Sequence, residues 1–262
     1  MDLNLSGKHA LVCGASQGIG RATAQALAEL GATVTLLARD AKALEAVRAA
    51  LPAKHGQKHS ALVADFDHPA ELAAMLAKSL PGLPAVNILI NNSGGPPGGA
   101  AATAALDEYR KAFERHLMCN QVLVQAVLPG MRKSGYGRIV NIISTSVREP
   151  IKGLGVSNSI RGAVASWAKT LSIELGPDGI TVNNLLPGFT RTQRLDVVFK
   201  ARMEKFNMSR AAVEADALAE VPLGRFAEPQ EPADAIAFLC SPAAAYISGV
   251  SLPVDGGRMR SI

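Results

Sequence analysis

The sequence predicts an α/β fold in which a doubly wound, parallel sheet has helices on both faces. Seven short runs are apolar almost throughout, whereas a strand with one exposed face alternates apolar and polar residues, so both faces of these strands are expected to be covered. Segments with apolar residues at helical spacing separate the runs. We expect the strands at residues 10–13, 33–37, 60–64, 86–90, 138–143, 180–186 and 251–254.

The chain has 262 residues, of which 48% are hydrophobic, and this is enough for a sizeable core. It shows no Pro/Ser-rich linker, repeat, low-complexity tract or apolar run of membrane-spanning length, and residues 1–8 lack the pattern of a signal peptide. We therefore expect a single domain over residues 1–262 in a soluble, cytoplasmic protein that does not enter a membrane.

The net charge of +5 does not indicate a nucleic-acid-binding protein. Lysine and arginine are scattered without a basic run, and only 4% of the residues are aromatic. Cys13, Cys119 and Cys240 lie far apart in apolar surroundings, without the spacing of metal ligands, so we expect buried thiols and no metal site.

A strand, a glycine-rich turn and a helix follow one another in residues 8–32. Glycines let the backbone turn sharply or approach a ligand, and the free N–H groups of the following helix form a natural phosphate site. Glycines also end strands for purely structural reasons, so this stretch alone leaves both interpretations open. The candidate phosphate-binding residues are Gly14, Ser16, Gln17, Gly18, Ile19 and Gly20.

At the end of the second strand, the place where a carboxylate would bind the ribose of NAD is held by Ala38 and followed by Arg39. An arginine there favours the 2′-phosphate of NADP(H) over NAD(H). The alternative is an exposed arginine, followed by Asp40 as the N-cap of the next helix. After the third strand, Asp65 and Phe66 are candidates to bracket an adenine.

The segment after the fourth strand is too polar and glycine-rich for a core. We expect its backbone to pass close to the cofactor at Asn92, Ser93 and Gly94. Because right-handed crossovers place the carboxyl ends of all parallel strands at one edge of the sheet, this segment and the other candidate loops should gather there.

Six motifs occur in order: CGASQGIG (13–20), ILINNSGG (88–95), GRIVNIIS (137–144), WAKTLSIELG (167–176), VNNLLPGFTRT (182–192) and SGVSLPVDGG (248–257). Together they resemble the classical short-chain dehydrogenase/reductase family, and most closely its 3-oxoacyl-(acyl-carrier-protein)-reductase-like members. The resemblance implies a Rossmann-type sheet with strand order 3-2-1-4-5-6-7. The chain departs from the family at Cys13, which is usually threonine, and at Ser93, which is usually alanine.

The family reduces carbonyls or oxidises alcohols with a serine, a tyrosine, a lysine four residues later and an asparagine. By this resemblance the serine corresponds to Ser144, while Ser157 stands at the tyrosine position, Arg161 at the lysine position and His116 at the asparagine position. Serine is much harder to ionise than tyrosine, and arginine does not release its proton as lysine does. A substitute acid from His116, which as a histidine titrates near neutral pH, or from Lys152 is one hypothesis, and a buried, hydrogen-bonded His116 is the other.

The segment after the sixth strand should border the nicotinamide, with Pro187 and Gly188 making a turn and Thr190 or Thr192 reaching the carboxamide or phosphates. The alternative is a loop with a helix cap. Residues 191–220 form a long insertion, and by the resemblance the segment at about 190–220 is the substrate lid of the family. Apolar residues there either line a pocket or pack the lid down; they are Val197, Val198, Phe199, Met203, Phe206 and Met208.

Assembly as a homotetramer or homodimer is what the resemblance implies, through the helix at residues 158–175, its neighbour and the final strand. Two functions remain open. The first is an NADP(H)-dependent oxidoreductase that acts on a small-molecule carbonyl or alcohol with an altered proton-donating site. The second is a non-catalytic NADP-binding protein that serves as a sensor or partner subunit.

Overall fold

A computed structural model describes residues 1–261. Its centre is a parallel sheet in the order β3-β2-β1-β4-β5-β6-β7, which confirms the predicted fold class and strand order. The seven strands lie within a residue or two of the expected positions. They are β1 His9–Cys13, β2 Thr33–Ala38, β3 Ser60–Val63, β4 Ile88–Asn91, β5 Gly137–Ile142, β6 Ile180–Pro187 and β7 Ser251–Val254.

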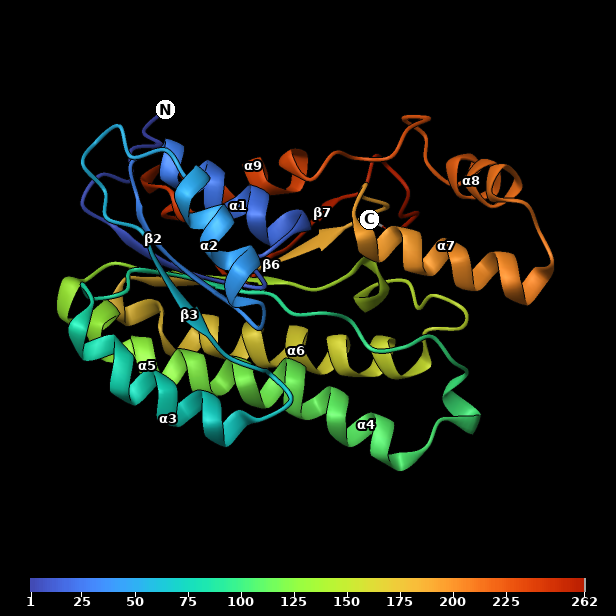
Figure 1. Ribbon diagram of the computed structural model, residues 1–262, viewed down its shortest axis with the longest axis horizontal. Coiled ribbons are helices and arrows are strands. Elements are labelled where there is room, and N and C mark those ends of the chain that lie inside the picture. Colours follow the sequence, from blue (N-terminus) through green and yellow to red (C-terminus); the bar gives the residue numbers. More distant parts are fainter. Residues whose placement is uncertain (262) are drawn as a thin grey trace.

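Helices cover both faces of the sheet (Figure 1). One face packs against α1, α2 and α9, and the other against α3, α5 and α6, so that each face has its own apolar core. The helices are α1 Gly18–Glu29, α2 Ala41–Ala50, α3 Pro69–Ser79, α4 Leu106–Phe113, α5 Cys119–Ser134, α6 Gly155–Glu174, α7 Gln193–Phe206, α8 Arg210–Ala219 and α9 Gln230–Cys240. Within residues 1–261, no helix is long and apolar enough to span a bilayer.

A row of buried amides runs across the sheet, and we call Asn91, Asn141, Asn184 and Ser251 the asparagine row. Strand register places each of these residues beside the next. Asn91 donates to Asn141 (2.8 Å), Asn141 donates to Asn184 (2.9 Å), and the Asn184 amide donates to the Ser251 hydroxyl (3.1 Å). The row ties these four strands together in one register.

Helices α7 and α8 stand apart from the sheet and share a small apolar core of their own (Figure 1). Phe199 is fully buried in it, and Val198, Met203 and Met208 pack against it. These four side chains therefore pack the segment together. The remaining two apolar candidates, Val197 and Phe206, are more than half exposed.

Candidate functional site

The glycine-rich turn after β1 is too tight for side chains. A Cβ on Gly20 would lie 2.2 Å from the carbonyl oxygen of Gly14. Gly14 has a left-handed φ of 59°, and a Cβ there would lie 2.6 Å from the side-chain amide nitrogen of Asn92. Helix α1 begins here without a side-chain cap at Gln17 and without an acidic residue in its first turn. Its N–H groups and positive dipole end are therefore left for an anion.

The segments after β4 and β6 both meet the glycine-rich turn after β1. The amide of Asn92, directly after β4, donates to the carbonyl of Gly14 (3.3 Å). A Cβ on Gly18 would lie 3.2 Å from the methyl group of Thr192, in the segment after β6. The structure thus brings together residues that are distant in sequence and that were all predicted to contact a dinucleotide.

The segment after β6 is held in a compact turn. Pro187 ends the strand, and a Cβ on Gly188 would come within 2.6 Å of the Asp255 backbone, so this position has no room for a side chain. The Thr190 hydroxyl donates to the carbonyl of Gly188, and the Thr192 hydroxyl donates to that of Thr190, both at 3.2 Å. Of the two threonines, Thr190 is buried, whereas Thr192 borders the glycine-rich turn.

Arg39 and Asp65 lie at the neighbouring ends of β2 and β3. The Arg39 guanidinium is 3.9 Å from the Asp65 carboxylate, and its side chain is 70% exposed, so it is free to turn toward a ligand. Asp40 also caps α2 by accepting from the Ala43 N–H (2.9 Å), as the alternative interpretation expected. Phe66 is only 7% exposed and belongs to the core on the α3–α5 face, which leaves little of its ring for an adenine.

His116 lies on a π-helical turn, Glu114–Met118, between α4 and α5 and is buried. Its Nδ1 is 2.9 Å from the Ser93 hydroxyl, and its Nε2 has no partner among residues 1–261. Burial, and then the positive charges of Arg161, Arg115 and Arg194, hold its pKa well below the ordinary value of 6.5. The expectation that His116 titrates near neutral pH is wrong, because burial and three nearby cations disfavour its charged form.

Ser144 follows β5 and begins a 3₁₀ turn, where its hydroxyl accepts from the Ser146 N–H (3.1 Å). Ser157 and Arg161 are one turn apart on α6, and Ser157 is buried. The Arg161 guanidinium donates to the carbonyl of Ile142 at the end of β5 (3.2 Å), so α6 and β5 bring these residues to one edge.

The pKa of Arg161 is lower than that of a free guanidinium. Burial, and secondarily the charge of Arg194, lower its pKa to about 10. This is below the range expected of an arginine, but it leaves the side chain protonated at neutral pH. Arg161 therefore acts as a fixed cation and not as a proton shuttle.

Arg194, in the first turn of α7, was not predicted to belong to the site. Its guanidinium donates to the carbonyl of Pro96 in the loop after β4 (2.8 Å). The sequence gives no signal for this contact, because an arginine in a polar helix turn usually faces solvent. Lys152, the other candidate acid, is exposed. Tyr109 packs against the apolar cluster that contains Val156 and Ile160 of α6.

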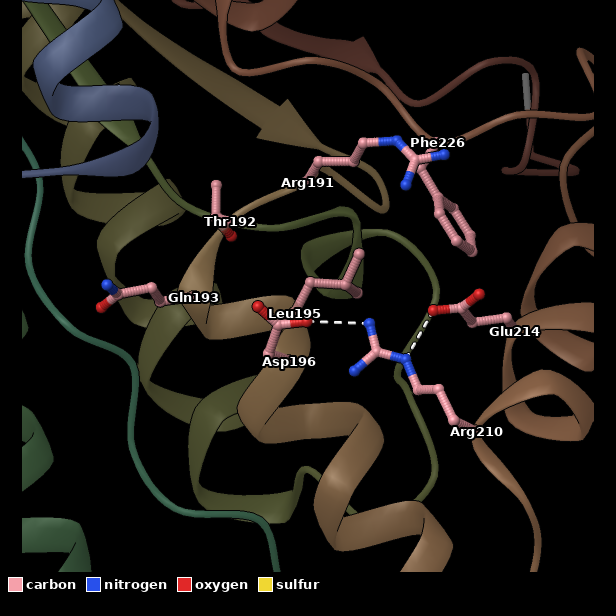
Figure 2. Close-up of a pocket in the computed structure, with 8 residues that line it drawn as sticks. All are labelled: Arg191, Thr192, Gln193, Leu195, Asp196, Arg210, Glu214 and Phe226. Carbon is pink, nitrogen blue, oxygen red and sulfur yellow. Dashed lines mark hydrogen bonds and ion pairs between the residues drawn. The ribbon is translucent and has the colours of Figure 1, made fainter.

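A pocket of about 360 Å³ lies between α7 and α8, as Figure 2 shows. Arg210 joins the two helices there by binding Asp196 (2.8 Å) and Glu214 (2.5 Å). Thr192, which borders the glycine-rich turn, also lines this pocket. The pocket therefore lies beside that turn. The three charged side chains of Arg210, Asp196 and Glu214 are paired with one another.

Comparison with known proteins decides the family. The family model described as enoyl-(acyl carrier protein) reductase matches residues 14–258. The chain is a short-chain dehydrogenase/reductase. It is 35% identical over 257 residues to the 3-oxoacyl-(acyl-carrier-protein) reductase FabG of Vibrio cholerae, covering 97% of this chain and 98% of that one.

Solved structures of the short-chain dehydrogenase/reductase family superimpose closely. The L-sorbose reductase of Gluconobacter frateurii, complexed with NADPH and L-sorbose, has a TM-score of 0.92 and 30% identity, with all of both chains covered. A short-chain oxidoreductase of Pseudomonas aeruginosa that contains an atypical catalytic center has a TM-score of 0.87 and 29% identity, covering 99% of this chain and all of that one.

Proposed function

We propose that this chain is an NADP(H)-dependent oxidoreductase that acts on a small-molecule carbonyl or alcohol, with Ser157 and Arg161 in place of the usual tyrosine and lysine. The observation that carries the proposal is the glycine-rich turn. It leaves no space for a Cβ at Gly14 or Gly20, it opens on an uncapped helix, and Thr192 lies beside it. The alternative, that its glycines only end a strand, does not account for the uncapped helix end.

NADP(H) fits the residues that are present. Gly14, Ser16, Gln17, Gly18, Ile19 and Gly20 would hold its phosphates, Arg39 its 2′-phosphate, Asp65 its adenine, and Arg161 its nicotinamide ribose. The loops after β4 and β6 would border the rest of it, through Asn92, Ser93 and Gly94 and through Pro187, Gly188, Thr190 and Thr192. When bound, the cofactor supplies a hydride to a carbonyl carbon.

The protein's own part in the reaction is to stabilise charge on the carbonyl oxygen. The Ser144 hydroxyl is available as a hydrogen-bond donor, since its recorded hydrogen bond uses only its acceptor capacity. Arg161 adds a fixed positive charge in a partly buried setting, where charge stabilisation is stronger than in water. Ser157 does not ionise near neutral pH, and His116 is neutral, so the proton for the product comes from water in this proposal.

The proposal is tested by binding first and turnover second. NADPH and NADH are titrated by fluorescence, and a panel of carbonyl compounds is then assayed for cofactor oxidation, with the Ser157→Tyr/Arg161→Lys double variant as a repaired control. Turnover by the unaltered protein supports the proposal. Binding without turnover, together with turnover by the repaired variant, supports the sensor or partner-subunit function. Absence of binding contradicts both.

The preference for NADP(H) rests on Arg39. A hydrogen bond to a charged group contributes about 1.5–3 kcal/mol, and we discount this for the exposure of Arg39. Arg39→Gln is expected to raise the Kd for NADPH about tenfold and to leave that for NADH nearly unchanged. Equal effects on both cofactors would contradict a role in binding the 2′-phosphate.

We also propose that α7 and α8 form the substrate lid and that the chain forms a homodimer or homotetramer. The lid proposal is supported by the separate core of the two helices and by the contact of Arg194 with the loop after β4. A lid of this kind closes over a substrate at the carboxyl edge of the sheet.

A further inference from the structure

Two guanidinium groups converge on Gly95. If Gly95 carried a Cβ, this atom would lie 3.3 Å from the terminal nitrogen of Arg161 and 3.3 Å from that of Arg194. Arg161 reaches this point from α6 and Arg194 from α7, so the sheet side and the proposed lid each supply one cation. The absence of a side chain at Gly95 leaves room for both groups, since a Cβ would crowd each of them.

Neither arginine has a carboxylate partner within ion-pair distance in the part of the chain that the structure describes. Their recorded hydrogen bonds go to the backbone carbonyls of Ile142 and Pro96. Neighbouring arginines differ in this respect: Arg191 pairs with Glu228, and Arg210 pairs with Asp196 and Glu214 (Figure 2). The positive charges of Arg161 and Arg194 are therefore not neutralised by a carboxylate, although those of Arg191 and Arg210 are.

Two like charges held close together in a partly buried place repel each other, and an anion between them removes this cost. The pKa shift of Arg161 shows that Arg194 acts on it in this way. Arg194 keeps access to solvent, and burial still lowers its pKa. Both side chains have N–H groups left over after their carbonyl contacts, so a planar, two-oxygen anion matches the donors that they present.

His116 adds a third group nearby. Its buried Nε2 is unpaired, and Arg161 and Arg194 both lie close enough to act on its charge. If Ser93 donates to Nδ1, then Nε2 carries the hydrogen of the neutral ring and is a further donor. The cations around it favour this neutral form, which adds a hydrogen bond donor without a charge.

We propose that the substrate of this site carries a carboxylate, which binds over Gly95 between Arg161 and Arg194. This inference rests on the proposed oxidoreductase function. The phosphates of the cofactor have a site of their own, at the glycine-rich turn and the N-terminus of α1. The space above Gly95 lies beyond Ser93 and Gly94, next to the helix that carries Ser157, and so it belongs to the substrate side.

The test measures equilibrium binding, with NADP⁺ present so that a carbonyl compound cannot be reduced. The protein saturated with NADP⁺ is titrated calorimetrically with two matched pairs, acetoacetate against ethyl acetoacetate and pyruvate against ethyl pyruvate. At least one acid is expected to bind ten times more tightly than its ester. Arg194→Gln should abolish this preference, as should Gly95→Ala, whose methyl group fills the space.

Lys200→Gln is the matched control, because it removes one positive charge from an exposed position on the same helix. It should keep the preference for the acid. In parallel, NADPH binding to the cofactor-free protein is followed by fluorescence and should be the same in the unaltered protein and in Arg194→Gln.

The possible outcomes separate this inference from the proposed function. If neither acid binds better than its ester, the inference is overturned while NADPH binding leaves the proposed function intact. If Arg194→Gln weakens NADPH binding and does not alter the preference for the acid, the arginines serve the cofactor phosphates instead. If NADPH does not bind to the unaltered protein, the proposed oxidoreductase function is contradicted, whatever the preference for the acid.

Discussion

Burial acts in the same direction on His116 and Arg161, because each is charged only when it carries its proton. For His116 the result is a neutral ring at pH 7, with its pKa well below the ordinary value. For Arg161 the pKa falls only to about 10, and the cation survives. His116 and Arg161 thus contribute a neutral ring and a fixed charge, and neither titrates near neutrality.

Stability should fall as the pH is lowered below 6.5, the ordinary pKa of histidine. In that range the unfolded chain binds a proton at His116, whereas His116 stays neutral in the folded protein. Protonation therefore favours unfolding. His9, buried between the Pro84 carbonyl and the Thr35 hydroxyl, has a lowered pKa and acts with the same sign. Urea unfolding at pH 7.5 and 5.5 measures the loss.

His116→Asn should reduce that pH dependence, because it removes one of the two contributing groups. The exposed His55 is the control, and His55→Gln should leave the dependence unchanged. An unaltered slope in His116→Asn would mean that His116 takes up its proton as readily in the folded protein as in the unfolded chain. In that case the neutral ring inferred for His116 would also be excluded.

Gly20→Ala should destabilise the protein and abolish NADPH binding together. The new methyl group would lie 2.2 Å from the Gly14 carbonyl, and forcing a methyl into such a contact costs about 1–3 kcal/mol. The displaced turn would no longer present its N–H groups to a phosphate. Thermal unfolding and fluorescence titration measure the two effects, and Gly82→Ala, which meets no atom within 4 Å, is the control. Normal NADPH binding by Gly20→Ala would contradict the phosphate site.

At the scale of elements, α7 and α8 depend on one another through their shared core. Phe199→Ala removes its central ring and should cost about 3–5 kcal/mol of local stability. We expect this loss to appear as faster proteolysis within residues 193–219, while the sheet remains protected. Phe206→Ala, at a position that is 59% exposed, should behave like the unaltered protein. Uniform loss of protection across the chain would mean that the two helices do not unfold separately.

The strands and most of the carboxyl-edge residues could be predicted because continuous apolar runs and glycine turns are local signals. The contact of Arg194 with Pro96 could not, since it joins residues 98 positions apart that carry no shared pattern. The burial of Phe66 was also missed, because an aromatic residue after a strand suits either a ligand or a core. For His116, the sequence could not show that Arg161 and Arg194 lie close by in the fold.

At the scale of the whole molecule, an exposed apolar residue of α6 has a place in the proposed assembly. Ile173 on α6 is 70% exposed, and the small residues Gly162 and Ala163 precede it on the same helix. Sedimentation velocity is expected to find a dimer or tetramer, and Ile173→Glu should shift it toward monomer. Because an exposed substitution changes stability by only about 0.5 kcal/mol, the monomer should stay folded.

Val197→Glu is the control for this measurement, since Val197 is 58% exposed on α7, outside the proposed interface. It should sediment like the unaltered protein. If the unaltered chain is already a monomer at micromolar concentration, the proposed assembly is wrong. The proposed cofactor site lies within one chain, so NADPH binding should persist in either case.

The asparagine row has a consequence for how the sheet reaches its correct register. Strands that are apolar on both faces lose little burial when one slides past another by a residue, because either face accepts aliphatic side chains. A slipped sheet would instead leave buried amides opposite hydrocarbon, at about 1–3 kcal/mol for each unpaired group. Asn91, Asn141, Asn184 and Ser251 therefore carry the alignment information that hydrophobicity lacks, and during folding they discriminate the native sheet from its shifted competitors.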